Sequence, residues 1–194
     1  MQEIKVNNVI IGKQFEDSEN YQKFLKIINK NKNKVYVVEA GERIKIEKNL
    51  YFDVLWPDSN NAVIENALNN NSLVSKLSYK NFSMLFTGDI EEIAEKKIVS
   101  IYGKSNMLDS IVLKVAHHGS KTSSCEEFIS TVKPKIALIG VGKNNKFGHP
   151  NNEVLERLNN LQCRIYRTDL NGEISINVNN KSEYKIITKI KMIV

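Results

Sequence analysis

The sequence predicts an α/β fold in which helices cover a sheet. Segments with the short apolar pattern of strands alternate with segments whose apolar residues recur at helical spacing, and several strand patterns end just before a helix begins. The length of 194 residues, with 41% hydrophobic and 26% charged residues, suits one globular domain with a sizeable core. No internal repeat or linker divides the sequence, so we expect a single domain.

The N-terminal part is expected to contain four short strands and one helix. A strand at residues 9–11 precedes a helix that Ser18 caps. The apolar face of this helix comprises Tyr21, Phe24, Leu25 and Ile28. The other strands are expected at residues 34–39, 43–46 and 51–56. Residues 58–71 contain six asparagines and show no periodicity, so we expect a mobile loop there.

The C-terminal part is expected to begin with a β-hairpin and then to alternate between helices and strands. Partial period-two alternation on both sides of Lys80 and Asn81 predicts the hairpin, at residues 72–79 and 82–86. Pro150 is expected in the first turn of the last helix. The other elements are helices at residues 90–102 and 124–132, strands at 111–116, 136–141, 164–168 and 173–178, and a turn at 169–172.

Composition narrows the class of protein. No apolar run approaches the roughly 18 to 20 residues that a bilayer span requires, and the N-terminus lacks the pattern of a signal peptide, so we expect a soluble, cytoplasmic chain. Cys125 and Cys163 lie in apolar segments without metal-ligand spacing and are interpreted as core thiols. The net charge of +6 and the pI near 9.1 favour a polyanionic partner, although the dispersed lysines suit a solvated surface equally well.

The three histidines of the chain, His117, His118 and His149, all follow predicted strands. Parallel strands present their carboxyl ends at one edge of a sheet, where α/β proteins bind ligands. A single histidine is more often structural, but three at successive strand ends favour a metal site, because neutral imidazole is a common ligand of zinc, manganese and iron. We therefore expect these side chains to lie together.

Asp89 also follows a strand and has two interpretations. It is a carboxylate ligand at the same sheet edge, or it begins a capping box with Glu92 at the start of the next helix, and the sequence favours neither. Ser120 raises nucleophilic catalysis as a third chemistry, but the chain lacks a G-x-S-x-G elbow. The neighbouring Ser123 or Ser124 is better explained as a helix cap.

Five segments, taken in order, resemble the metallo-β-lactamase-like domain of the ComEC competence proteins. They are SLV (72–74), LFTGD (85–89), LKVAHHGS (113–120), GHP (148–150) and YRTD (166–169). The resemblance covers nearly the whole chain, and its most specific piece is the His-His-Gly-Ser segment after a lysine-containing strand. It implies the C-terminal portion of an αββα sandwich, with residues 1–57 ending its first half and residues 72–194 forming its second half.

By the same resemblance, the domain hydrolyses phosphodiester bonds of DNA with divalent zinc or manganese ions, and it is attached to a membrane DNA channel. Two ions about 3.5 to 4 Å apart activate a water and stabilise the leaving oxygen in such sites. The implied roles are catalysis for Asp89 and His118, metal binding for Asp89, His117, His118 and His149, and substrate contact for Lys114, Ser120 and His149.

The H-x-H-x-D-H loop that supplies most metal ligands in this fold does not occur in the 194 residues, since no histidine precedes His117. One carboxylate and three imidazoles are too few donors for two ions, so we expect weak or absent metal binding and little hydrolysis by this chain. The alternative function is a non-catalytic module that binds nucleic acid or another partner. Half of a two-sheet sandwich would also leave an apolar sheet face uncovered, which favours a homodimer.

Overall fold

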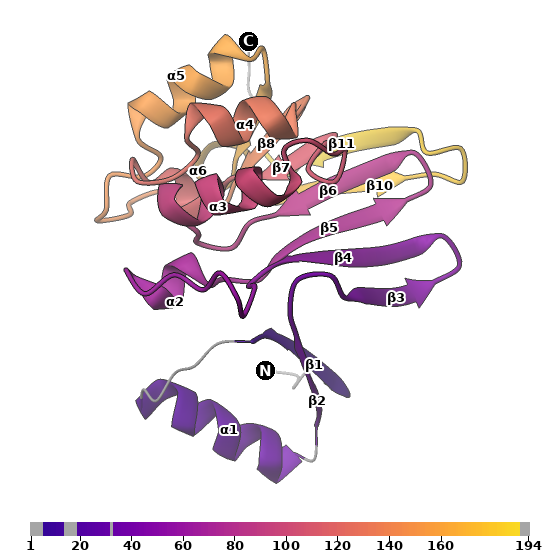
Figure 1. Ribbon diagram of the computed structural model, residues 1–194. Coiled ribbons are helices and arrows are strands. Elements are labelled where there is room, and N and C mark those ends of the chain that lie inside the picture. The colour runs from indigo at the N-terminus through magenta and orange to yellow at the C-terminus, as the bar shows by residue number, and fades with distance from the viewer. Residues whose placement is uncertain (1–5, 14–18, 32, 191–194) are drawn as a thin grey trace.

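The computed structural model describes residues 6–13, 19–31 and 33–190 of the chain. Seven strands form the central sheet in the order β3-β4-β5-β6-β7-β8-β9 (Figure 1). Their bounds are β3 (Arg43–Glu47), β4 (Leu50–Trp56), β5 (Val74–Tyr79), β6 (Phe82–Phe86), β7 (Val112–Lys114), β8 (Ile136–Ile139) and β9 (Arg164–Arg167). Strands β3 to β6 pair antiparallel, and β6 to β9 pair parallel. This mixed sheet with its covering helices confirms the predicted α/β class.

Three helices cover one face of the sheet, namely α3 (Glu92–Tyr102), α4 (Glu126–Val132) and α5 (Asn152–Asn160). They form the main core with the sheet, and Trp56, Leu85 and Phe128 are at most 1% exposed within it. Cys125 and Cys163 are buried in the same core, as expected. Burial raises the pKa of the Cys125 thiol to about 12, so that this thiol stays protonated and unreactive.

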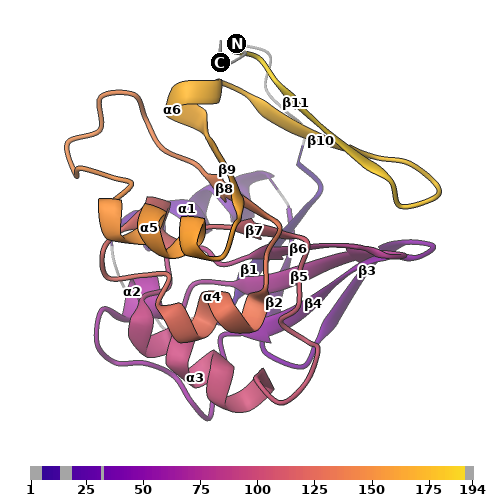
Figure 2. The same ribbon diagram turned by 90° about the horizontal axis from the view of Figure 1, so that it is seen from above.

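A hairpin of β10 (Ile174–Val178) and β11 (Tyr184–Thr188) packs on the opposite face, and Figure 2 shows the sheet between this hairpin and α4. Phe82 is buried beneath the hairpin, and its ring centroid lies 5.7 Å from that of Tyr184. The hairpin therefore covers, over β6 to β8, a face that we expected to be open. Strand β11 was missed because its apolar residues are adjacent and do not alternate.

The N-terminal strands and helix form a separate small unit (Figure 1). The two strands β1 (Asn8–Gly12) and β2 (Lys34–Val38) and the helix α1 (Glu19–Asn31) between them were predicted, and the structure shows that β1 and β2 pair in parallel. The proposed cap Ser18 lies outside the described residues. Gly12 approaches the main sheet closely, because a Cβ atom there would lie 3.0 Å from Cδ of Pro57. Within the described residues, every helix falls short of the length and apolar character needed to cross a membrane.

The segment at residues 58–71 is a loop over most of its length, as predicted, but it also has regular and buried parts. This segment contains the helix α2 (Ala67–Asn70), and Asn70 is fully buried. The side chain of Asn71 accepts a hydrogen bond from the backbone of Val63 at 3.0 Å and donates one to it at 2.8 Å, and the indole of Trp56 donates to the carbonyl of Asn70 at 2.6 Å. Asparagine side chains thus replace backbone pairing, which a search for apolar periodicity does not detect.

Several predicted boundaries are also wrong at the strand ends that matter for the site. The strand at 111–116 stops at Lys114 and leads into the 3₁₀ turn η1 (Ala116–Gly119), and the strand at 136–141 stops at Ile139. Pro150 lies outside α5, which Asn151 caps by accepting a hydrogen bond from the backbone N–H of Glu153. The turn at 169–172 is the short helix α6 (Thr168–Asn171).

Candidate functional site

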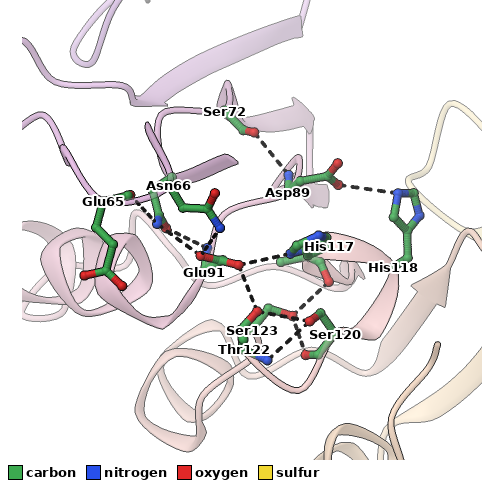
Figure 3. A network of polar contacts seen from close by, with 12 residues as sticks. Glu65, Asn66, Ser72, Asp89, Glu91, His117, His118, Ser120, Thr122 and Ser123 are labelled. Atoms are coloured by element: carbon green, nitrogen blue, oxygen red, sulfur yellow. Dashed lines mark hydrogen bonds and ion pairs between the residues drawn. The ribbon is translucent and has the colours of Figure 1, made fainter. Parts of the chain in front are cut away.

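The carboxyl ends of the parallel strands β6, β7 and β8 meet at one edge of the sheet, and the predicted site residues follow them. Asp89 lies after β6, His117 and His118 lie in η1 after β7, and His149 lies in the loop after β8. We call these four residues the strand-end cluster; Figure 3 shows three of them, Asp89, His117 and His118.

Asp89 is held by its backbone on a tight turn. Its N–H donates to Oγ of Ser72 at 3.2 Å, and Gly88 before it has a φ of +54°. A Cβ atom on Gly88 would lie 2.5 Å from Cβ of Ser72, so only glycine fits this turn. The N-cap of α3 is Glu91, which shows that the capping-box interpretation of Asp89 is wrong. The carboxylate is therefore free of a helix-capping role and is 39% exposed.

Two cations or potential cations lie beside the Asp89 carboxylate. Its Oδ1 is 3.7 Å from Nε2 of His118 and 3.9 Å from Nζ of Lys114. The Lys114 ammonium also donates to the carbonyl of Gly88 at 3.2 Å. Burial lowers the pKa of Lys114, and the charge of Asp89 partly opposes this. Lys114 is thus a partly buried positive charge at the edge of the cluster.

His117 and His118 both adopt a left-handed backbone conformation, with φ values of 47° and 56°. Non-glycine residues rarely occupy this region, and the cost is about 1 kcal/mol or more for each. The N–H of His117 donates to the carbonyl of Gly88 at 3.2 Å, and its carbonyl accepts from the N–H of Ser120 at 2.9 Å. These contacts on either side of the two histidines maintain their strained conformation and so fix the direction of both side chains.

His118 is anchored by β8. Its Nδ1 lies 2.6 Å from the carbonyl oxygen of Gly140, and because a carbonyl only accepts, Nδ1 carries the proton. The other ring nitrogen, Nε2, faces Asp89. The side chain is 47% exposed, so this nitrogen is available to an ion or a substrate.

His117 is anchored by Glu91, a residue that the sequence did not identify. Nδ1 of His117 is buried without a close hydrogen bond and lies 3.5 Å from Oε1 of Glu91. The Glu91 carboxylate also accepts hydrogen bonds from Thr122 at 3.0 Å, Asn66 at 3.0 Å and Asn70 at 3.3 Å (Figure 3). A carboxylate behind a histidine orients the ring, so Glu91 supports the cluster from beneath.

His149 completes the cluster as one of three neighbouring aromatic rings. Its ring centroid lies 5.9 Å from that of His117 and 5.8 Å from that of Phe147. Burial lowers the pKa of His149, and the charges of His117 and His118 lower it further. These effects favour the neutral imidazole, which is the form that binds metals.

Ser120 lies behind the cluster and is buried. Its Oγ is 3.0 Å from Oγ1 of Thr122, and its backbone N–H donates to the carbonyl of His117 at 2.9 Å. The neighbouring serines do not cap α4 as expected, because its N-cap is Cys125. Instead the buried carboxylate of Glu95 accepts from the N–H groups of Ser124 and Cys125 at 2.6 and 2.8 Å.

The YRTD segment supports the β8 strand end. Oγ1 of Thr168 accepts a hydrogen bond from the N–H of Val141 at 2.7 Å and lies 2.8 Å from the carbonyl of Val141. Arg167 and Asp169 form a two-point ion pair with distances of 3.0 and 2.5 Å. These contacts fix the start of the loop that carries His149.

The donor types of the cluster suit a divalent metal, but their number does not. Within the described residues, no three histidine, cysteine, aspartate or glutamate side chains lie close enough together to hold an ion. The contacts that do form are pairs, such as Asp89 with His118 and Glu91 with His117. The described residues alone therefore do not form a complete metal site.

Comparison with known proteins places the chain among competence proteins, although no family model matches it. The chain is 35% identical over 177 residues to ComE operon protein 3 of Bacillus subtilis, covering 91% of this chain and 22% of that protein. It is 32% identical over 123 residues to competence protein ComA of Neisseria gonorrhoeae, covering 63% of this chain and 17% of that protein. The chain belongs to the ComEC-type family. It spans about a fifth of the length of these ComEC-type relatives, as the covered shares of 22% and 17% show.

A solved structure from Parabacteroides distasonis, described as a metal-dependent hydrolase, aligns with a TM-score of 0.49 and 16% identity over 84% of this chain and 64% of that chain. The segments on which the ComEC resemblance was based meet at the strand-end cluster. LFTGD, HHGS and GHP carry the cluster, SLV supports Asp89 through Ser72, and YRTD supports the β8 end through Thr168.

Proposed function

We propose that this ComEC-type domain takes part in metal-dependent hydrolysis of DNA phosphodiester bonds during DNA uptake, in a protein that includes a membrane channel. The observation that carries the proposal is the convergence of Asp89, His117, His118 and His149 at the ends of three parallel strands, beside the ammonium of Lys114. Imidazole and carboxylate groups are the donors that hydrolytic metal ions use, and a lysine suits the phosphate of the substrate.

The proposed roles follow from the position of each side chain. Asp89 and His118 face each other with exposed polar atoms, and they would hold metal and act in catalysis. His117 and His149 would complete the metal-binding side of the cluster. Lys114 and His149 would contact the substrate phosphate, and Ser120, which is buried against Thr122, would act from behind the cluster.

Since the described residues alone do not form a complete metal site, we propose that this chain by itself binds zinc or manganese weakly and cleaves DNA poorly. The remaining donors would come from an H-x-H-x-D-H loop that these 194 residues do not contain. The metal in the complete site would supply an activated water and stabilise the developing charge on phosphate.

A second candidate function is a non-catalytic module that binds nucleic acid. The net charge of +6 and the shortage of metal donors within the described residues favour it. The two functions differ in whether metal binding depends on the cluster. A module would bind DNA with strong salt dependence and would not respond to loss of Asp89 and His118.

Calorimetric titration of manganese and zinc into the purified chain tests the proposal. We expect weak binding that is lost in a D89A/H118A double variant. Asp109 offers a matched control, because its side chain is also 39% exposed and also lies near a lysine, Lys133 at 3.6 Å. The D109A variant should bind metal as the unaltered chain does.

The same proteins are then incubated with single- and double-stranded DNA and manganese. We expect little cleavage by the unaltered chain and none by D89A/H118A. Metal binding that the double variant leaves unchanged would overturn the assignment of the site. In ComE operon protein 3, replacing the residues aligned with Asp89 and His118 should impair DNA uptake, and normal uptake would overturn the proposed function.

A further inference from the structure

The loop between β8 and α5 exposes an aromatic side chain next to the strand-end cluster. Phe147 is 81% exposed, although a phenylalanine normally contributes to a core. Its ring is stacked on His149, with 5.8 Å between the ring centroids and an angle of 18° between the planes. His149 lies 5.9 Å from His117 in turn, so a row of three rings runs from the loop into the cluster.

The loop is ordered by a single asparagine, which holds Phe147 in this exposed position. Oδ1 of Asn145 accepts from the N–H of His149 at 2.9 Å, and its Nδ2 donates to the carbonyls of His149 at 2.7 Å and Gly142 at 3.2 Å. These bonds close the segment around Phe147, so binding a ligand there requires little ordering of the chain.

The same loop is positively charged. Lys143 and Lys146 are exposed, and residues 140–151 contain no aspartate or glutamate. An exposed aromatic ring on a loop with two exposed lysines combines a stacking surface for a base with charges for the adjacent phosphates, which is how proteins bind single-stranded nucleic acid. Bases in a duplex are stacked on each other and do not offer a free face to such a ring.

We propose that residues 142–149 bind single-stranded DNA, with one base stacked on Phe147 and the adjacent phosphates neutralised by Lys143 and Lys146. The choice of DNA rests on the proposed function, whereas the preference for a single strand rests on the exposed ring. A base held on Phe147 lies beside His149, and the backbone that follows it passes the cluster. The loop thus selects an unpaired strand and directs it to the site.

Fluorescence anisotropy without metal tests this proposal, because chelator prevents cleavage and separates binding from hydrolysis. The probes are a labelled oligothymidylate and an abasic strand of the same length, which has the same phosphates but no bases. The F147A variant should bind the oligothymidylate about five- to tenfold more weakly, as expected for the loss of one stacked base. Its affinity for the abasic strand should not change.

A K143A/K146A variant should weaken both probes equally and reduce the slope of log affinity against log salt by about 1.4, at roughly 0.7 for each phosphate contact. Matched controls are available on β3 and the turn after it, at the opposite edge of the sheet from β9. Ile46 is an exposed apolar residue there, and Lys45 and Lys48 are exposed lysines. The I46A and K45A/K48A variants should bind both probes as the unaltered chain does.

The F147W variant provides both rescue and a direct signal. It should restore affinity for oligothymidylate, and the fluorescence of the introduced indole should be quenched when a base stacks on it. The native Trp56 is fully buried and will not report on the loop. Equal affinity of F147A and the unaltered chain for oligothymidylate, absence of quenching in F147W, or failure of the unaltered chain to bind at low salt would each overturn the proposal.

The outcomes of the two proposals remain distinguishable. Loss of base-dependent binding in F147A with unchanged metal binding supports this inference whether or not the chain cleaves DNA. Cluster-dependent metal binding and cleavage together with unchanged DNA binding by F147A would leave the proposed function intact and overturn the inference about the loop.

Discussion

Replacing Glu95 with glutamine should remove a specific part of the pH dependence of stability. Glu95 is fully buried in α3, and its carboxylate accepts two backbone N–H groups at the start of α4. Burial is the largest effect on this group and raises its pKa from 4.5 to about 7, while the bonds from Cys125 and Ser124 act in the opposite direction. The folded protein therefore binds a proton at this site more tightly than the unfolded chain does.

The sign of the effect follows from proton linkage. Between pH 4.5 and about 7 the folded protein retains a proton that the unfolded chain has lost, so stability falls as pH rises through this window. The contribution is fully present below pH 4.5 and is lost above about pH 7, a total of roughly 3 kcal/mol. A glutamine does not titrate, so E95Q should lack this decline.

Urea unfolding at several pH values between 4.5 and 8 measures the effect. We expect the free energy of unfolding of the unaltered chain to fall by roughly 3 kcal/mol relative to that of E95Q across the window. Glu92 on the same helix is the control, because its side chain is 52% exposed and its charge has only a minor effect on the pKa of Glu95, so E92Q should change the profile only slightly. Parallel pH profiles for E95Q and the unaltered chain would refute the reasoning.

Two further predictions concern the support of the cluster. G119A should lower the free energy of unfolding by roughly 2 kcal/mol or more, because Gly119 has a φ of +79° and a Cβ atom there would lie 2.6 Å from Cβ of Pro150. Gly148 has a similar φ of +70°, but a Cβ atom there would have no neighbour within 4 Å, so G148A should lower the free energy of unfolding by only about 1 kcal/mol. Equal urea midpoints for the two variants would contradict this. E91Q should destabilise the fold by about 1 to 3 kcal/mol, because the NH₂ group of glutamine cannot accept the hydrogen bonds that Asn66 and Thr122 donate to the Glu91 carboxylate. E91Q should also change the ¹⁵N tautomer signature of His117. An unchanged His117 signal would show that Glu91 does not orient it.

The position of the strand-end cluster could be predicted from the sequence because it depends only on the order and direction of the strands. Asp89, His117 and His149 each follow a strand, and parallel pairing of β6, β7 and β8 brings such positions together. The same reasoning gave most helices and strands, because their apolar periodicity is strong.

Glu91 could not be found in this way. Its role depends on contacts with Asn66 and Asn70, which belong to a segment without apolar periodicity, and on a helix that begins two residues later than predicted. The left-handed conformation of His117 and His118 is equally absent from the pattern, because it arises from tertiary contacts on either side. Periodicity identifies the elements but not the hydrogen bonds that orient a site.

The anchoring of His118 to Gly140 also has a consequence for the order of folding. This bond joins residues 22 positions apart, and Thr122 is 31 positions from the Glu91 carboxylate that it contacts. Parallel strands have to be joined by crossovers before such contacts form, and nonlocal pairing is slow. His118 therefore acquires its orientation only after β8 has docked on β7, and a partially folded chain that lacks this step presents no assembled site. Because of the hydrogen bond at the end of β8, the exposed pair of His118 and Asp89 forms only in the folded domain.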